Sequence, residues 1–280
     1  MALASPLQPS FVQRRSASAA ALFGAAAGLA AIASGGLAGC GALWRPSPIA
    51  MSMLYHLDAC STRAPVLLVL LPGAHMAPEE LQREGFVHAV RQRGLAVDMM
   101  LVDSHLGYVY DGSLFERLYH DVLAPAHAQG WHRIWLAGIS LGAYAAMGCA
   151  MRHPSLVEGV LAIAPYVGRQ GLVQEIAAAR AQGRSLQQWL LSSSPRTGTN
   201  GEPDADHALW QWLVQRPSDA PPLHLAYGLQ DRFVAGHELM AQTLPPQRVS
   251  TAPGGHDWSP WRRLWAQWLD QGLLPARCPA

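Results

Sequence analysis

Short apolar runs alternate with amphipathic stretches along the chain from residue 53 onward. Val66–Leu71 contains only Val and Leu, which is typical of a strand buried on both faces of a sheet. Further strands are predicted at Leu95–Val102, Arg133–Ala137, Gly159–Ala164, Leu223–Tyr227 and Arg248–Ser250. Helices are predicted between them, over Pro78–Arg93, Ser113–His127, Leu141–Arg152 and Gly236–Thr243. This alternation predicts an α/β fold with a mostly parallel central sheet and helices on both faces.

The last amphipathic stretch has the clearest helical pattern of the chain. Ser259 stands where an N-terminal cap is expected, and Pro260 fits the first turn of a helix. Apolar residues follow at helical spacing: Trp261, Leu264, Trp265, Trp268 and Leu269. We expect the tryptophans of this helix to pack on the sheet rather than to bind a ligand.

One segment interrupts the alternation. Between the predicted strands that end at Ala164 and begin near Pro222, the pattern predicts helices and no strand. They are expected over Leu172–Gln182, Leu186–Leu191 and Ala205–Gln215, and they carry Trp189, Trp210 and Trp212. An insertion at this place would lie over the carboxyl ends of the strands, where open α/β sheets bind ligands. We therefore expect a helical cap at about 166–220; the alternative is a surface excursion without a role in binding.

Residues 1–44 do not have the pattern of a folded domain. Arg14 and Arg15 precede an uncharged stretch, Ser16–Trp44, that is rich in Ala and Gly. A positive segment followed by an apolar one is typical of a signal peptide. Within the stretch, Leu37-Ala38-Gly39-Cys40 resembles the lipobox of bacterial lipoprotein signal peptides.

This resemblance implies a signal peptide over 1–39, a lipid-modified Cys40 and an exported protein anchored to a membrane of the cell envelope. A tether is then expected over 40–52, followed by the globular domain at 53–271 and a C-terminal tail at 272–280. Two alternatives remain open at this stage. One is an ordinary signal peptide with a coincidental cysteine, and the other is an uncleaved helical anchor, because the apolar stretch is long enough to span a bilayer.

Composition narrows the classes of protein. With 50% apolar and 14% charged residues, the chain can bury a large core, which excludes a disordered protein. A formal net charge of +1 provides no overall attraction to nucleic acid, so no nucleic-acid partner is expected. The four cysteines, Cys40, Cys60, Cys149 and Cys278, lie far apart without a CxxC pair and indicate neither a zinc site nor a disulfide framework. Cys149 is expected in the core, and no metal site is expected among the scattered histidines.

The most informative segment is a predicted strand that runs into Gly138-Ile139-Ser140-Leu141-Gly142 and then into an Ala-rich helix. A serine at a tight strand-to-helix turn is held in a strained conformation that neighbouring side chains would obstruct. Gly138 and Gly142 remove that obstruction, and the helix N-terminus behind Ser140 favours developing negative charge. A GxSxG sequence is common by chance, but its place between a buried strand and a helix indicates a nucleophile.

A serine nucleophile needs a base that a carboxylate orients, and in this context the acid and then the histidine should follow along the chain. Asp231 stands just past the predicted strand Leu223–Tyr227, and His256 lies in the Gly-rich loop after the next strand. Asp103, which closes a strand, is an alternative for the orienting carboxylate. Asp257 is a weaker one, because sequence neighbours rarely point together.

In these features the chain resembles the α/β-hydrolase superfamily over roughly residues 53–271. The resemblance implies that Ser140 is the nucleophile, that His256 is the general base and then acid, and that Asp231 holds the imidazole in the useful tautomer. It also implies an oxyanion hole of two backbone N–H groups, of which Leu141 would supply one.

The second oxyanion donor would come from Pro72-Gly73-Ala74-His75-Met76, the loop after the first buried strand. Ala74 is the first choice and His75 the alternative. Pro72 departs from the His-Gly that many relatives carry at this point, and the Gly-rich HGGG version is absent. The pocket itself is expected to be lined by residues of loops above the sheet, namely His75, Met76, His105 and Tyr108, although these are equally compatible with ordinary loop positions.

The sequence therefore predicts a serine hydrolase that cleaves carboxylic esters, esterase-like or lipase-like, through an acyl-enzyme on Ser140 and without a cofactor. The substrate is expected to be a small-molecule or lipid ester, with an acyl or aromatic group suggested by the three tryptophans of the predicted cap. A thioesterase or an acyltransferase on the same triad is an alternative. A further alternative, from a different class, is a non-catalytic binding lipoprotein with this fold.

Overall fold

The computed structural model describes residues 46–48, 50–57, 59–60, 63–193, 204–274 and 278. The predicted signal peptide and Cys40 lie outside the described residues, so their prediction stays open. No helix in the described part of the chain has both the length and the apolar character to cross a membrane.

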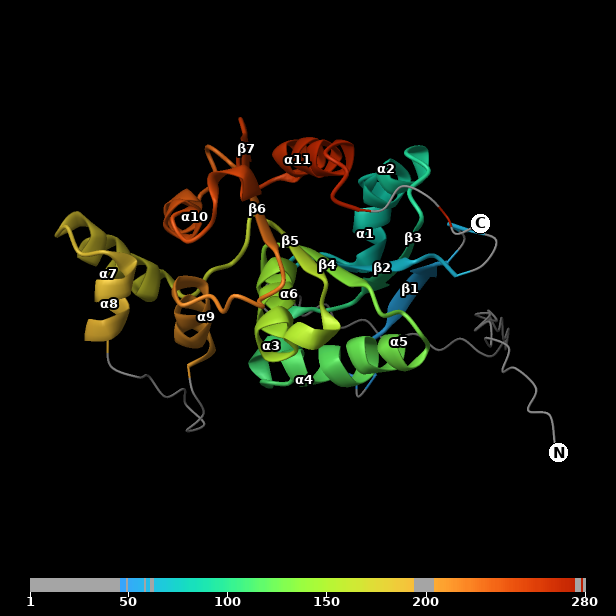
Figure 1. Ribbon diagram of the computed structural model, residues 1–280, viewed down its shortest axis with the longest axis horizontal. Coiled ribbons are helices and arrows are strands. Elements are labelled where there is room, and N and C mark those ends of the chain that lie inside the picture. The colour runs from blue at the N-terminus through green and yellow to red at the C-terminus, as the bar shows by residue number, and fades with distance from the viewer. Residues whose placement is uncertain are drawn as a thin grey trace, which may run out of the picture. The chain divides into compact units, whose positions relative to one another are not determined.

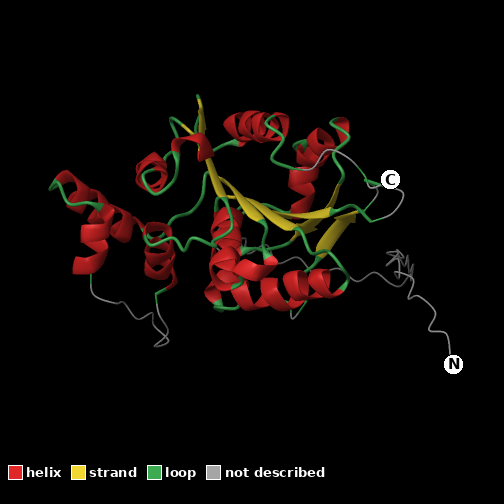
Figure 2. Ribbon diagram, viewed as in Figure 1, coloured by secondary structure: helices red, strands yellow, loops and turns green. Residues whose placement is uncertain are grey.

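A mostly parallel sheet forms the centre of the described structure (Figures 1 and 2). Its order is β1-β3-β2-β4-β5-β6-β7; β1 is antiparallel to β3, and every other neighbouring pair is parallel. The strands are β1 (Met53–His56), β2 (Val66–Leu71), β3 (Val97–Val102), β4 (Ile134–Ile139), β5 (Gly159–Ile163), β6 (Leu223–Gly228) and β7 (Val249–Ala252). The predicted mostly parallel sheet is confirmed. The edge strand β1 was not predicted, because it lacks a fully buried apolar run.

Helices cover both faces of this sheet (Figure 2). In β2, Leu67, Val69 and Leu71 face one apolar core, while Val66, Leu68 and Leu70 face the other. The first core includes residues of α4 (Leu114–Arg117) and α6 (Leu141–Arg152). The second includes residues of α1 (Pro78–Arg83), α2 (Phe86–Gln92) and α11 (Trp258–Asp270). The expected packing of the α11 tryptophans on the sheet is confirmed, since Trp261, Trp265 and Trp268 are all buried in the second core.

Several predicted helix boundaries are wrong for local reasons. The helix predicted over Pro78–Arg93 is two helices, because the chain turns at Gly85, whose φ is 85°. The helix predicted over Ser113–His127 consists of α4, a π-helical stretch at Leu118–Leu123 and α5 (Ala124–Ala128). The expected cap of α11 is two residues too late: Asp257, not Ser259, is the N-cap, and its Oδ1 accepts the Ser259 N–H at 2.9 Å.

The segment between β5 and β6 is helical, with α7 (Gln170–Ala181), α8 (Leu186–Ser192) and α9 (Ala205–Val214). Among these helices (Figure 1), α7 packs against α10 (Val234–Ala241) and α8, α8 packs against α9, and α9 packs against α6. Trp189, Trp210 and Trp212 are buried, and Trp210 donates its indole N–H to the Val167 carbonyl at 2.7 Å. These tryptophans therefore stabilise the packing of the inserted helices.

A disulfide joins Cys60 to Cys278, with their Cα atoms 5.7 Å apart. This corrects the interpretation of the cysteine spacing, which indicated no disulfide. The two residues are 218 positions apart in the sequence, and only the fold brings the segment before β2 close to the chain end. Cys149 lies buried in α6, as expected.

Candidate active site

Ser140 lies in the turn between β4 and α6, at the carboxyl edge of the sheet. Its φ of 54° and ψ of −110° are strained for a residue with a side chain. The turn is held by backbone hydrogen bonds: the Ser140 N–H donates to the Ile163 carbonyl at 2.9 Å, and the Ser140 carbonyl accepts the Tyr166 N–H at 3.0 Å. The end of β5 therefore supports the strained backbone conformation of Ser140, which lines a cavity at this edge of the sheet.

The two glycines around Ser140 are required by close backbone approaches. A Cβ on Gly138 would lie 2.2 Å from the Gly142 carbonyl carbon, and one on Gly142 would lie 2.1 Å from the Leu71 carbonyl oxygen. The second contact presses the start of α6 against the end of β2. Because β2 and β4 are neighbours whose connections leave in opposite directions, this place is also the switch point of the sheet.

The loop after β2 consequently lies beside the nucleophile turn. Ala74, His75 and Met76 line the same cavity as Ser140 and Leu141. Leu141 is the first residue of α6, so its N–H has no acceptor within the helix. The two backbone groups predicted as oxyanion donors, those of Leu141 and Ala74, thus belong to adjacent segments at one edge of the sheet.

The loops after β6 and β7 are joined to each other. The Gln230 N–H donates to the Gly254 carbonyl at 2.9 Å, and the Gln230 side-chain oxygen accepts the Gly254 N–H at 2.6 Å. A Cβ on Gly228 would lie 2.3 Å from the Gly254 carbonyl oxygen, so glycine permits this approach. These contacts hold the segment of Asp231 against the segment of His256.

Asp231 and His256 are directly hydrogen-bonded, with 2.8 Å between Oδ2 and Nδ1. The Asp231 side chain is fully buried, and its Oδ1 accepts the Phe233 N–H at 2.8 Å. Burial opposes ionisation of this carboxyl, but the hydrogen bonds from His256 and Phe233 outweigh it and lower the pKa of Asp231. The ionised carboxylate places the imidazole proton on Nδ1 and leaves Nε2 as an acceptor.

The His256 ring is also fixed by aromatic contacts. Phe233 and Trp261 each meet it edge to face with centroids 5.0 Å apart. His256, Phe233, Trp261 and Ser140 all line one cavity of about 890 Å³. Among the described residues, no hydrogen bond joins the Ser140 hydroxyl to His256. Hydrogen bonds of this kind commonly shorten when a substrate binds.

The structure also places the alternatives to Asp231. The Asp103 carboxylate accepts the Ser52 hydroxyl at 3.5 Å, and Asp257 caps α11, whereas His256 is bonded to Asp231. Both alternatives therefore have other partners.

Of the residues expected to line the pocket, His75 and Met76 do so, but His105 and Tyr108 do not. His105 caps α3 (Leu106–Tyr110) through Nδ1, and Tyr108 is buried with its hydroxyl donating to the Pro48 carbonyl at 3.2 Å. This segment is a short helix rather than the expected loop. Its other face lines the cavity through Leu106, Val109 and Tyr110.

A set of hydrogen-bonded polar residues that also lines this cavity was not predicted from the sequence. Asp206 accepts the Tyr166 hydroxyl at 3.2 Å and the Arg169 N–H at 2.9 Å, and the Arg169 guanidinium also pairs with Asp204. Tyr144, one helical turn after Ser140, packs edge to face on Tyr166. These residues are scattered between positions 144 and 206 and form no motif, so no sequence signal could have found them. The three tryptophans of the insertion, in contrast, do not line this cavity.

The described residues contain no group of three or more His, Cys, Asp or Glu side chains that could hold a metal ion. The functional groups gathered in the cavity are a hydroxyl, an oriented imidazole and backbone N–H donors. Such a set is suited to acyl transfer to the serine.

Comparison with known proteins identifies the fold. No protein-family model matches the chain, and no curated protein matches it. A fluorophosphonate-binding serine hydrolase of Staphylococcus aureus, FphF, is similar with a TM-score of 0.55 and 14% identity, covering 79% of this chain and 97% of its own. An S-formylglutathione hydrolase of the same organism, FrmB, has a TM-score of 0.52 and 13% identity, covering 82% and 98%. An esterase from a marine microorganism has a TM-score of 0.51 and 12% identity, covering 81% and 100%.

These similarities confirm the α/β-hydrolase fold that the sequence predicted. At such low sequence identity they establish the fold alone, because one fold hosts many activities. The function has to be inferred from the residues of the cavity.

Proposed function

We propose that the protein hydrolyses carboxylic esters through an acyl-enzyme on Ser140. The observation that carries this proposal is the hydrogen-bonded pair of Asp231 and His256 lining the same cavity as a serine held in a strained strand-to-helix turn. A strained, partly exposed serine that lines one cavity with an oriented imidazole has no evident structural purpose, but it is what an activated nucleophile requires.

In the proposed reaction, His256 Nε2 accepts the hydroxyl proton while Ser140 Oγ attacks the ester carbonyl carbon. Asp231 stabilises the resulting imidazolium, and the N–H groups of Leu141 and Ala74 stabilise the negative oxygen of the tetrahedral intermediate. When the carbon–oxygen bond of the ester breaks, His256 returns the proton to the leaving alcohol. A water molecule, deprotonated by His256, then attacks the acyl carbon. His256 gives this proton to Ser140 Oγ as the bond between Oγ and the acyl carbon breaks, which releases the carboxylic acid and restores the serine.

The first test combines a fluorophosphonate probe with turnover of p-nitrophenyl acetate. The wild-type protein should be labelled at one serine and should hydrolyse the ester. Ser140→Ala should abolish labelling and lower turnover by about 10⁴–10⁶, since the nucleophile is lost. Ser259→Ala, at an exposed serine of α11, is the matched control and should behave like the wild type. Turnover by Ser140→Ala close to that of the wild type would contradict the proposal.

We further propose that the protein is exported and anchored to a membrane through a lipid on Cys40. Support comes from the lipobox-like sequence at 37–40 and from the disulfide between Cys60 and Cys278, since disulfides persist in oxidising compartments outside the cytosol. Cys40→Ser should release the protein from washed membranes. Unchanged membrane retention of that variant would instead favour an uncleaved helical anchor.

A further inference from the structure

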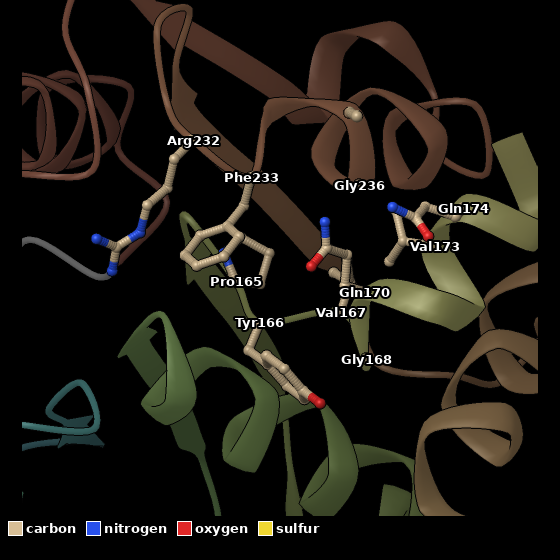
Figure 3. A pocket seen from close by; sticks show the side chains of 11 residues that line it. Pro165, Tyr166, Val167, Gly168, Gln170, Val173, Gln174, Arg232, Phe233 and Gly236 are labelled. Carbon is tan, nitrogen blue, oxygen red and sulfur yellow. The ribbon is translucent and has the colours of Figure 1, made fainter.

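A second cavity, of about 390 Å³, adjoins the candidate active site. It lies between the segment after β5, the first turns of α7 and the start of α10, and Figure 3 shows its lining residues. Tyr166, Arg232 and Phe233 line both this cavity and the one that contains Ser140. The two cavities are therefore adjacent and share these three lining residues.

The walls of the second cavity are mostly apolar. Val167 and Val173 lie on one side and the start of α10 on the other, while the amides of Gln170 and Gln174 are the polar groups contributed by α7 (Figure 3). Apolar walls with a few polar groups are typical of small-molecule sites. Phe233 and Tyr166 add two aromatic rings where this cavity meets the catalytic one.

Close packing fixes the back of this cavity. A Cβ on Gly236 would lie 2.7 Å from Val167 Cγ2, so α10 approaches the segment after β5 as closely as a glycine allows. The next residue of α10, the buried His237, donates from Nε2 to the Pro165 carbonyl at 2.9 Å. These two contacts tie α10 to the segment after β5, and the cavity is consequently preformed.

The position of Phe233 relates the second cavity to the chemistry. In the proposed reaction, His256 gives its proton to the leaving oxygen, so the alcohol portion of the ester lies on the His256 side of the reacting carbon. Phe233 packs edge to face on His256, with centroids 5.0 Å apart, and is also a wall of the second cavity. An alcohol portion that extends past His256 therefore meets Phe233 and the second cavity.

We propose that this second cavity is the subsite for the alcohol portion of the substrate and that it takes an aromatic alcohol. The proposal rests on the ester hydrolysis proposed above. Aromatic rings at the entrance, apolar walls behind them and a volume of about 390 Å³ suit a flat apolar group of one or two rings. The acyl portion is then left to the part of the catalytic cavity that Leu106, Val109 and Tyr110 of α3 line.

Ala235→Trp tests this assignment. Ala235 is an exposed residue of α10 that lines the second cavity, so an indole at this position would fill the cavity without entering the core. Ala178→Trp is the matched control, because Ala178 is an exposed alanine of α7 that lines neither cavity. Three substrates vary the alcohol portion and the acyl portion of the ester independently: 2-naphthyl acetate, ethyl acetate and ethyl hexanoate.

For 2-naphthyl acetate, Ala235→Trp should lower kcat/KM by about tenfold to a hundredfold, because the displaced rings lose their apolar contacts. Its kcat/KM for ethyl acetate and ethyl hexanoate should remain that of the wild type, and Ala178→Trp should leave all three unchanged. A loss confined to ethyl hexanoate would overturn the proposal by assigning the cavity to the acyl portion. An unchanged rate with 2-naphthyl acetate would overturn it as well.

A binding measurement separates this proposal from that of ester hydrolysis. The Ser140→Ala protein should bind 2-naphthol in a calorimetric titration, the additional change Ala235→Trp should abolish that binding, and Ala178→Trp should preserve it. If the wild-type protein hydrolyses no ester but 2-naphthol binds in this Ala235-dependent way, ester hydrolysis fails and the aromatic subsite stands. If esters are hydrolysed and 2-naphthol does not bind, the subsite proposal fails alone.

Discussion

Gly142→Ala probes the contact between the nucleophile turn and the loop that carries the second oxyanion donor. The added Cβ would lie 2.1 Å from the Leu71 carbonyl oxygen and 2.6 Å from the Pro72 carbonyl oxygen, whereas ordinary van der Waals contact begins at 3.4 Å. Both obstacles are backbone atoms, which no rotamer change can remove. The loop after β2 must therefore move by about 1 Å, and Ala74 moves with it.

The expected loss follows from the function of that loop. Removal of one oxyanion donor costs about 10²–10³ in kcat, and a displacement of about 1 Å in a catalytic geometry costs about 10². We expect Gly142→Ala to lower kcat for p-nitrophenyl acetate by about a hundredfold with little change in KM, because the lost contact forms only in the transition state. Overpacking should also lower the free energy of unfolding by about 1–3 kcal/mol.

Gly171→Ala is the control for this experiment. Gly171 lies in α7, and a Cβ there would meet nothing within 4 Å. The variant should retain the wild-type kcat and gain about 0.5–1 kcal/mol of stability from the higher helix propensity of alanine. Steady-state kinetics and urea unfolding give both quantities for each variant. A folded Gly142→Ala protein with the wild-type kcat would refute the placement of the second donor on this loop.

Three further predictions follow from other parts of the structure. Asp231→Asn should lower kcat by a factor of about 10⁴, because the amide no longer holds the imidazole with its proton on Nδ1. Asp257→Asn should stay active, because asparagine also caps helices. Steady-state kinetics compare the two variants, and equal losses of kcat would contradict the assignment of Asp231 as the orienting carboxylate. Cys278→Ser should lower the free energy of unfolding under oxidising conditions by about 2–4 kcal/mol by opening the disulfide to Cys60, and a urea midpoint equal to that of the wild type would count against the bond. Burial lowers the pKa of His224 to about 4, from an ordinary value of 6.5. Between these two pH values, the unfolded chain binds a proton at His224 that the folded protein does not bind. The free energy of unfolding should therefore fall as the pH falls from about 6.5 to about 4. We expect a loss of about 1–2 kcal/mol, because solvent screens this partly exposed ring. The Tm of His224→Gln should decrease less between pH 7 and pH 4.5 than the Tm of the wild type does.

Features that depend on neighbouring residues could be predicted from the sequence. The buried strand β4, the glycines around Ser140 and the helix α6 form one continuous segment whose pattern is local. The order of Asp231 and His256 after β6 and β7 could be recognised in the same way, since each follows an identifiable strand.

Features that depend on the rotation of a helix about its axis, or on contacts between distant residues, could not be predicted from the sequence. Tyr108 was expected in the pocket, but the rotation of α3 buries it and presents Tyr110 instead. The three tryptophans of the predicted cap suggested an acyl or aromatic substrate, yet Trp189 is buried among the inserted helices. The spacing of apolar residues along an inserted helix is the same whether those residues face a cavity or a neighbouring helix.

The sequence by itself determined the order of strands β2 to β7 along the chain, the strand-to-helix turn at Ser140 and the three side chains proposed for catalysis. Only the tertiary structure decided which carboxylate contacts His256, that Cys60 meets Cys278, and that Phe233 lines two adjacent cavities. The physical reason is the range of the interactions: apolar periodicity and backbone conformation act over a few neighbouring residues, whereas a hydrogen-bonded pair, a disulfide or a cavity forms between segments that only the packing of the sheet brings together.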